Sequence, residues 1–469
     1  MAETAIAIER PGEACGVFGM YGPGQDPARL TYFGLFALQH RGQESAGIAV
    51  AHDESITVVK DLGLVAQVFD EQTLASLEGD IAVGHTRYST TGSSVWENAQ
   101  PIYRQVGENG IALAHNGNLT NTRLLAEQIG KLFATTDSEL MAEALASAMR
   151  QGLTLEKAAL ETLPLFEGAF SLAIMDRESL LAVRDPHGFR PLCLGRLNGG
   201  FVVASETAAL DIIGAEFERQ VAPGEMIVID GDGLRSHRPF APAPPRLCIF
   251  EFVYFARPDS ILDGHNVHAA RRRMGYRLAE QAPAAADVVV PVPESGIPAA
   301  QGFAAATGLP LADGLIKNRY VGRTFIQPAQ AMRDQGIRMK LNPIPEELDA
   351  RRVVLVDDSI VRGSTTRRLV QMVREAGAAE VHLRISSPPY RWPCFYGMDT
   401  GDRSTLLAAD RTVDEIREYL GVDSLAYLGL NGLIEATGVH DGGLCTACLS
   451  GRYPTEVAGA GDKYVLERS

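Results

Sequence analysis

The stretch that says most about the fold is Val353-Val354-Leu355-Val356-Asp357-Asp358-Ser359-Ile360, followed closely by Arg362-Gly363-Ser364-Thr365-Thr366. Its four aliphatic residues predict a buried parallel strand, and the two acids come at the strand's carboxyl end, where open α/β sheets place their ligands. The small polar residues that follow can offer N–H groups and hydroxyls to a phosphate at a helix N-terminus. Paired carboxylates suit a sugar or its Mg2+, so the stretch predicts a sugar-phosphate site. A simple helix cap is the alternative, but it would explain Ser359 and not two adjacent acids.

Composition limits the class of protein. The chain has 469 residues, too many for one ordinary core, and its 46% hydrophobic and 22% charged content is typical of a soluble globular protein. A net charge of −15 argues against nucleic acid as a partner. No apolar run is long enough to span a bilayer, and residues 1–13 carry three Glu instead of a basic start, unlike a secretory signal. We therefore expect a cytoplasmic protein without a membrane partner.

The chain divides at a short Pro-rich stretch, residues 239–245, which is typical of a stiff linker. It separates a predicted domain at 15–238 from a second one at 246–469. Before it, short β-branched runs such as 81–84 and 111–114 alternate with helical stretches such as 138–150. This pattern favours two sheets with helices over a doubly wound sheet for the first domain.

Five motifs of the first domain resemble, in this order, the glutaminase domain of class II glutamine amidotransferases, which are N-terminal-nucleophile hydrolases. They are Cys15-Gly16-Val17-Phe18-Gly19, Gln39 to Gly47, Gly84 to Thr90, His115-Asn116-Gly117-Asn118 and Thr136-Asp137-Ser138-Glu139. The resemblance implies an αββα sandwich. It also implies that residues 1–14 are a leader peptide whose removal makes Cys15 the N-terminus.

The chemistry explains these residue types. Hydrolysis of the glutamine amide needs a strong nucleophile, a base and an oxyanion site. A free α-amine on Cys15, with an ordinary pKa of about 7.7–8.0, can take the thiol proton, whereas an amide nitrogen cannot. Asn116 and Gly117 would hold the oxyanion. The resemblance further implies that Arg87 pairs with the glutamine carboxylate and Asp137 with its α-amine.

The second domain continues with Val288-Val289-Val290-Pro291, ending in a polar turn that contains Ser295, and with the basic segment 317–326. Basic side chains on a loop could neutralise a departing pyrophosphate. These stretches resemble the type I phosphoribosyltransferase domain of amidophosphoribosyltransferases, also called glutamine phosphoribosylpyrophosphate (PRPP) amidotransferases, and imply an α/β domain with a parallel sheet. One departure is Ser364, where the family usually has Thr; Ser keeps the hydroxyl and the N–H. The residues that the resemblance assigns to PRPP are Lys317, Arg319, Tyr320, Arg323, Asp357, Asp358, Ser359, Arg362, Gly363, Ser364, Thr365 and Thr366, and it assigns Ser295, Asp357 and Asp358 to Mg2+.

Four cysteines suggest a metal site. Cys445 and Cys448 form a C-x-x-C pair, while Cys248 and Cys394 are single. Their spacing leaves a zinc site and a 4Fe-4S cluster about equally probable. The resemblance favours the cluster, because one branch of the family combines a leader peptide with a cluster held by cysteines at these positions. We expect that cluster to be structural, because the overall reaction transfers no electrons.

The combined resemblance implies that the chain makes 5-phosphoribosylamine from PRPP and glutamine, the first step of purine synthesis, and passes ammonia internally between its domains. It also implies a homotetramer and feedback inhibition by purine nucleotides. Two other hypotheses stay open from the residues: an amidotransferase with a different acceptor, and a non-catalytic PRPP-binding regulator. The first has no use for Asp357 and Asp358, and the second does not explain Cys15, Arg87, Asn116 and Asp137 together.

Overall fold

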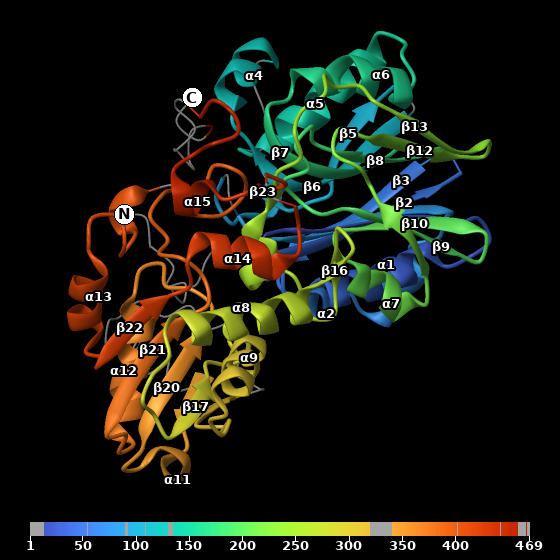
Figure 1. Ribbon diagram of the computed structural model, residues 1–469. Coiled ribbons are helices and arrows are strands. Elements are labelled where there is room, and N and C mark those ends of the chain that lie inside the picture. Colours follow the sequence, from blue (N-terminus) through green and yellow to red (C-terminus); the bar gives the residue numbers. More distant parts are fainter. Residues whose placement is uncertain are drawn as a thin grey trace.

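The computed structural model describes residues 14–457 except 54, 90–91, 108, 130–134, 319–339, 401 and 441, together with residue 466. Figure 1 shows two parts, a first half drawn in blue to green and a second half drawn in yellow to red. Of the predicted site residues, Arg319, Tyr320 and Arg323 lie outside the described residues, as does the leader except for Ala14.

The first half contains two antiparallel sheets that face each other. In the described part of the chain, one has seven strands in the order β11-β9-β10-β1-β4-β2-β3, and the other has six in the order β13-β12-β8-β7-β6-β5. The first sheet consists of β1 (Gly16–Tyr21), β2 (Ser45–His52), β3 (Ser55–Leu62), β4 (Ile81–Arg87), β9 (Cys193–Leu197), β10 (Gly200–Ala204) and β11 (Glu216–Gln220). The second consists of β5 (Ile102–Val106), β6 (Asn109–Leu119), β7 (Gly168–Met175), β8 (Leu180–Arg184), β12 (Met226–Asp230) and β13 (Gly233–His237).

Helices cover the outer face of each sheet, which confirms the αββα sandwich (Figure 1). Side chains alternate along β1, so each face of the strand packs against a different layer: Phe18 and Met20 pack toward the helices, whereas Val17 packs between the sheets. The helices beside the first sheet are α1 (Pro27–Ala37), α2 (Val65–Val68), α3 (Glu71–Ala75) and α7 (Thr207–Ile213). Those beside the second are α4 (Thr122–Ile129), α5 (Asp137–Arg150) and α6 (Leu155–Thr162), and the short turns η1 (Trp96–Asn98) and η2 (Leu163–Leu165) lie in connections.

The second half is built on a parallel sheet with the order β17-β20-β21-β22. Its strands are β17 (Val288–Pro291), β20 (Arg352–Asp357), β21 (Glu380–Ile385) and β22 (Ser424–Tyr427). Strand β20 is the predicted buried strand: Val354 and Val356 pack toward α8 (Val267–Gln281) and α9 (Ile297–Thr307), while Val353 and Leu355 pack toward α12 (Ser364–Glu375) and α13 (Val413–Leu420). All four side chains are fully buried, as a strand covered on both faces requires.

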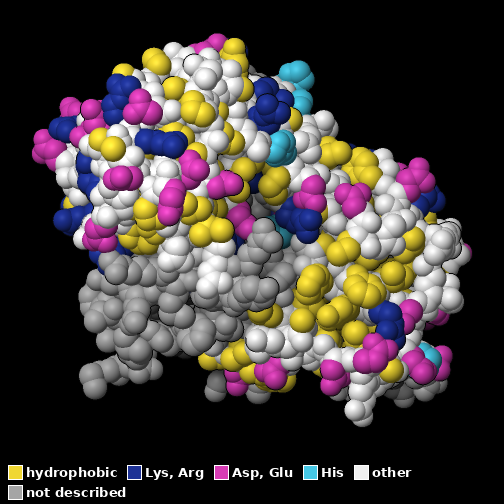
Figure 2. Space-filling view, turned by 90° about the horizontal axis from the view of Figure 1, so that it is seen from below, with side chains coloured by type: hydrophobic (Ala, Val, Ile, Leu, Met, Phe, Trp, Pro, Cys, Tyr) yellow, Lys and Arg dark blue, Asp and Glu magenta, His cyan; other side chains and the backbone are white. Residues whose placement is uncertain are grey.

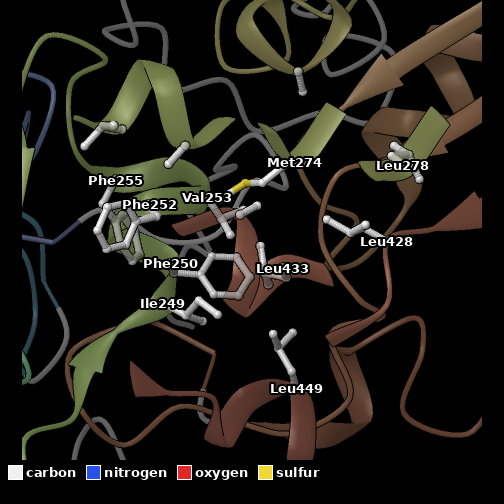
Figure 3. Close-up of a cluster of buried hydrophobic side chains, with 14 of the residues drawn as sticks. Ile249, Phe250, Phe252, Val253, Phe255, Met274, Leu278, Leu428, Leu433 and Leu449 are labelled. Atoms are coloured by element: carbon white, nitrogen blue, oxygen red, sulfur yellow. The ribbon is translucent and has the colours of Figure 1, made fainter. Parts of the chain in front are cut away.

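The C-terminal region returns to the start of the second half. Figure 3 shows Phe250 close to Leu433, in the cluster that also contains Phe252, Leu449 and Met274 of α8. The short strands β14 (Leu247–Cys248) and β23 (Leu444–Cys445) pair in parallel and join the two ends of this half. The remaining elements are η3 (Glu251–Phe255), β15 (Ile261–Leu262), β16 (His265–Asn266), β18 (Leu315–Lys317), β19 (Leu341–Pro343), α11 (Pro345–Leu348), η4 (Arg403–Thr405), α14 (Leu430–Thr437) and α15 (Ala447–Ser450).

Residues 238–246, which contain the predicted linker, form neither helix nor strand. The domain limits 15–238 and 246–469 remain a prediction. Among the described helices, none combines the length and the apolar character needed to cross a membrane.

Candidate active sites

Cys15 lies directly before β1 in the first half. Its Sγ donates to the main-chain oxygen of Tyr88 over 3.3 Å, and its own carbonyl oxygen accepts from Arg41 Nε at 3.0 Å. Burial raises the pKa of the Cys15 thiol above its ordinary value. Ala14 precedes it and is buried, so the nitrogen of Cys15 is here an amide. A thiol with a raised pKa needs a base close by, and a freed α-amine would provide one.

The predicted oxyanion residues Asn116 and Gly117 lie on β6. The Nδ2 of Asn116 is buried and finds no hydrogen-bond partner among the described residues, which is rare for a native amide. Gly117 has a φ of +152°, and a Cβ there would lie 2.0 Å from the carbonyl oxygen of Ala169. Only glycine fits, and a donor without a partner beside it is what an oxyanion site requires.

A pocket brings the nucleophile together with Gly117 and with both predicted glutamine-binding residues, Arg87 at the end of β4 and Asp137 at the start of α5. Arg87 is 2% exposed; its Nη1 donates to the oxygen of Ser93 at 3.2 Å. Burial lowers its pKa, but the Glu44 carboxylate 3.7 Å away counters that effect. A guanidinium and a carboxylate in one small pocket are complementary to the two charges of a free amino acid.

Sequence reasoning missed several residues of this pocket. Gln100 is the clearest case: its Oε1 accepts from His115 N at 2.8 Å and its Nε2 donates to Ser138 Oγ at 3.0 Å. It lies just before β5 and outside every motif, so no local signal points to it. The complete lining consists of Cys15, Arg87, Tyr88, Gln100, His115, Gly117, Thr136, Asp137 and Ser138.

In the second half, the structure brings the predicted Mg2+ residues together. Asp357 ends β20, and one of its oxygens accepts from the N–H of Asp358 at 2.9 Å. The Asp358 carboxylate accepts from the hydroxyls of both Ser295 and Ser359. Ser295 follows β17, the neighbouring strand, so its place beside Asp358 follows from the parallel sheet. Carboxylate and hydroxyl oxygens at one sheet edge can bind Mg2+ or ribose hydroxyls.

The predicted phosphate loop leads into α12. Gly363 has a φ of +84°, and a Cβ there would lie 2.4 Å from the Leu407 Cδ2 atom. Ser364 begins α12 and is followed by Thr365 and Thr366, so these residues form the helix's first turn. N–H groups of a first turn point out of the helix and attract phosphate.

Lys317, the described part of the predicted basic loop, ends β18. Its Nζ lies 3.0 Å from the Glu294 carboxylate, and both side chains are largely exposed. Glu294 belongs to the turn after β17, so Lys317 reaches the same sheet edge as Ser295.

The four cysteines of the predicted metal site come from distant segments that meet. Cys248 and Cys445 face each other across the β14–β23 pair, and Cys448 lies in α15. The carbonyl oxygen of Cys448 accepts from Arg391 N and Trp392 N, which places Cys394 nearby. None is in a disulfide. Burial, the Glu251 carboxylate and a neighbouring thiol raise the pKa of Cys248 to about 11, and burial and the neighbouring thiols raise the pKa of Cys448 well above its ordinary value. Among the described residues, no group of three or more His, Cys, Asp or Glu is placed to hold a metal ion.

Comparison with known protein families gives two matches. Residues 85–211 match a family described as a glutamine amidotransferase domain, and residues 258–386 match the phosphoribosyl transferase domain.

Similar proteins match over nearly the full chain. An amidophosphoribosyltransferase of Mycobacterium tuberculosis is 54% identical, covering 96% of this chain and 88% of the relative, and one of Synechococcus elongatus is 55% identical, covering 96% and 93%. Among solved structures, the glutamine PRPP amidotransferase of Bacillus subtilis complexed with ADP and GMP has a TM-score of 0.88 and 46% identity, covering 94% of this chain and 98% of that one.

Proposed function

Because this chain belongs to the amidophosphoribosyltransferase family, and so makes 5-phosphoribosylamine from PRPP and glutamine in the first step of purine biosynthesis, we propose which of its residues perform each part of that reaction. The observation that supports the proposal most directly is the pocket that joins Cys15, Arg87, Gly117 and Asp137.

In the first half, Cys15 is the nucleophile for glutamine hydrolysis. Removal of residues 1–14 frees its α-amine, which takes the thiol proton. The sulfur then attacks the amide carbon, and Asn116 Nδ2 and the Gly117 N–H hold the oxyanion. Ammonia leaves with the returned proton, and water hydrolyses the thioester to glutamate. Arg87 and Asp137 hold the two charged ends of the amino acid.

In the second half, ammonia attacks C1 of PRPP and pyrophosphate leaves. Asp357 and Asp358 bind the ribose or its Mg2+, and Ser295 supplies a further oxygen ligand for Mg2+. When bound, Mg2+ neutralises charge on the diphosphate. Residues 362–366 hold the 5-phosphate at the start of α12, and Lys317, Arg319, Tyr320 and Arg323 bind the leaving pyrophosphate. Ammonia reaches C1 by an internal passage, because ammonia released to neutral water would mostly be protonated and lose its nucleophilicity.

We propose that the four cysteines would hold a 4Fe-4S cluster and that the chain belongs to the branch of the family that has a leader and a cluster, although the described side chains, as they stand, place no three of them around one ion. The support is that Cys248, Cys394, Cys445 and Cys448 come from three segments as thiols outside any disulfide, and that repulsion from neighbouring thiolates helps to raise the pKa of Cys248, Cys445 and Cys448. Deprotonated thiolates need a bound cation to offset that repulsion, and soft iron–sulfur centres take four of them. The cluster fastens the C-terminal region to the rest of the molecule.

The relatives and the surface also support a proposal for assembly and regulation. The Bacillus subtilis enzyme was solved in complex with ADP and GMP, which supports purine nucleotides as inhibitors here. Phe33 and Phe36 on α1 are 42% and 52% exposed and Ile212 on α7 is 47% exposed. Figure 2 shows hydrophobic side chains gathered over this part of the first half. Such a patch supports self-association, and we propose a homotetramer that works in the cytoplasm.

One assay tests the reaction and separates its rivals. Pyrophosphate release from PRPP is measured with glutamine, with ammonia and with neither. We expect pyrophosphate release with glutamine and with ammonia, and none when both are absent. An amidotransferase with another acceptor would release none, and a non-catalytic PRPP-binding regulator would neither release pyrophosphate nor hydrolyse glutamine.

A further inference from the structure

A segment of the second half, Cys394–Gly397, packs against the strand that carries the proposed oxyanion donors. The oxygen of Phe395 accepts from the Asn118 Nδ2 atom at 3.1 Å, and Asn118 is two residues after Asn116 on β6. The oxygen of Tyr396 accepts from Arg190 Nε at 3.0 Å, and Arg190 is fully buried. Two side chains of the first half therefore hold two successive carbonyl groups of this segment.

The Tyr396 side chain is held by a ring contact and by hydrogen bonds to its hydroxyl. Its ring stacks on Phe189 of the first half, with centroids 4.2 Å apart and planes 12° apart. Its hydroxyl pairs with the Thr455 Oγ1 atom at 2.8 Å and accepts from Thr455 N at 3.2 Å. The side chain is only 2% exposed. A buried, stacked and hydrogen-bonded ring fixes the backbone on either side of it.

Gly397 makes the closest approach to the oxyanion residue. Its φ is +102°, and a Cβ on it would lie 3.1 Å from the carbonyl carbon of Gly117, 3.2 Å from the Gly117 Cα and 3.0 Å from Arg190 Nη2. On its other side, Gly117 leaves no room either, since a Cβ there would meet the Ala169 oxygen of β7. The backbone of Gly117 is therefore enclosed between β7 and the Cys394–Gly397 segment.

We propose that Tyr396 and Gly397 are positioning residues for glutamine hydrolysis, which hold Asn116 and Gly117 in the geometry that binds the oxyanion. This inference rests on the oxyanion role proposed above for these two residues. Oxyanion donors act only if they are fixed where charge develops, so a shift of a few tenths of an ångström lowers kcat while ground-state binding of glutamine stays nearly unchanged. Neither Tyr396 nor Gly397 is among the residues that line the pocket.

The first test uses two glycines with matching backbone. Gly397→Ala places a methyl group against Gly117, whereas Gly233→Ala carries the same strain, at a φ of +105°, with nothing within 4 Å. Gly397→Ala should lower the kcat of glutamine-dependent synthesis by about tenfold to hundredfold, as partial loss of an oxyanion donor does. Its KM for glutamine and its ammonia-dependent rate should stay within about twofold of the parent protein, on the same argument. Gly233→Ala should resemble the parent in all three values.

The second test uses a conservative pair. Tyr396→Leu removes the stack on Phe189, while Tyr396→Phe keeps the stack and loses only the hydroxyl, so only the Leu variant should show the kcat loss. If Gly397→Ala does not fold, the Tyr396 variants test the inference instead: the kcat with glutamine should fall while the ammonia-dependent rate stays unchanged. Equal loss of both activities in a folded variant, or no loss in either, would overturn the inference. Cys15→Ala is measured alongside. If this variant still uses glutamine, the proposed function fails. If it does not, unchanged kcat values in the Tyr396 and Gly397 variants count against the positioning role alone.

Discussion

At the scale of single residues, the two candidate sites contain different chemical groups and lie in different halves of the molecule. The proposed glutamine pocket is small, with a buried thiol, guanidinium and carboxylate around it. The second site lies at the carboxyl edge of the parallel sheet, with Asp357, Asp358 and Ser295. Because each site has its own residues, single substitutions should separate the two half-reactions.

Cys15→Ala should abolish glutamine-dependent synthesis and leave ammonia-dependent synthesis at high ammonium largely intact. The reason is that the proposed nucleophile belongs to the first half and the proposed PRPP-binding residues to the second. Both rates are measured as pyrophosphate release. Parallel loss of the two would mean that Cys15 has a structural role.

Asp357→Asn or Asp358→Asn should impair synthesis with both nitrogen sources, because each source needs bound PRPP. A charged hydrogen bond is worth about 1.5–3 kcal/mol, which corresponds to about tenfold or more in affinity. The measurement is the apparent KM for PRPP with ammonia, and Asp287→Asn, at an exposed ion pair with Arg352, is the control. Unchanged values would exclude these acids from the site.

At the scale of elements, the turn from β20 to α12 sets the geometry of the phosphate loop. Gly363 has the left-handed backbone that lets the chain reverse from strand to helix, and Leu407 closes the space where a side chain would go. The sheet edge and the helix start therefore meet at one glycine.

Gly363→Ala should raise the KM for PRPP about tenfold or more, since the left-handed conformation alone costs about 1–2 kcal/mol and the new methyl group must also displace Leu407. The matched control is Gly421→Ala, at a φ of +72° with open space around it. Steady-state kinetics with ammonia as the nitrogen source avoid any effect on the first half. Equal effects of the two substitutions would show that strain, and not the loop's geometry, is responsible.

At the scale of the whole molecule, a buried ion network joins the halves. Arg41 of the first half makes two hydrogen bonds with Glu251 of η3, at 2.8 and 3.0 Å, and Arg190 adds a third at 3.1 Å. All three side chains are fully buried. Removal of one partner would leave an uncompensated charge in the interior.

Glu251→Ala should therefore destabilise the protein by about 3–5 kcal/mol and lower its melting temperature. Asp287→Ala, which breaks an exposed pair with Arg352, should have a much smaller effect. Thermal unfolding followed by circular dichroism compares the two variants. Similar shifts would show that the inter-half network contributes no more than a surface pair.

Protein purified without oxygen should be brown, with iron and sulfide near about four each per chain, as in any 4Fe-4S centre. Ser in place of Cys248, Cys394, Cys445 or Cys448 should give colourless, poorly soluble protein that keeps its leader, while Cys193→Ser, at a buried cysteine outside the set, should stay brown. Intact mass under native and denaturing conditions reports cluster, leader and subunit number together. Stoichiometric zinc without iron would refute the cluster and keep the four-thiolate site.

The sequence alone was enough for the parts of this protein whose signal is local. The αββα sandwich was expected from the family resemblance of the motifs between Cys15 and Glu139, and the ligand site at the two acids stays a prediction. The aliphatic run of β20 itself predicted a buried parallel strand, and the small polar residues after it predicted a helix start. These signals are local because strand burial and turn chemistry depend on neighbouring residues. The roles of the site residues, the leader and the cluster stay predictions.

Only the tertiary structure decided which distant residues meet. Gln100 enters the glutamine pocket from a loop without a motif, Glu251 pairs with an arginine 210 positions before it, and Gly397 closes on Gly117. None of these contacts follows from periodicity or spacing, because the partners belong to different elements whose packing is fixed only when both cores form. The sequence by itself therefore determined the strands, the turns and the chemical groups, and the packing of the two halves determined which of those groups hold one another in place.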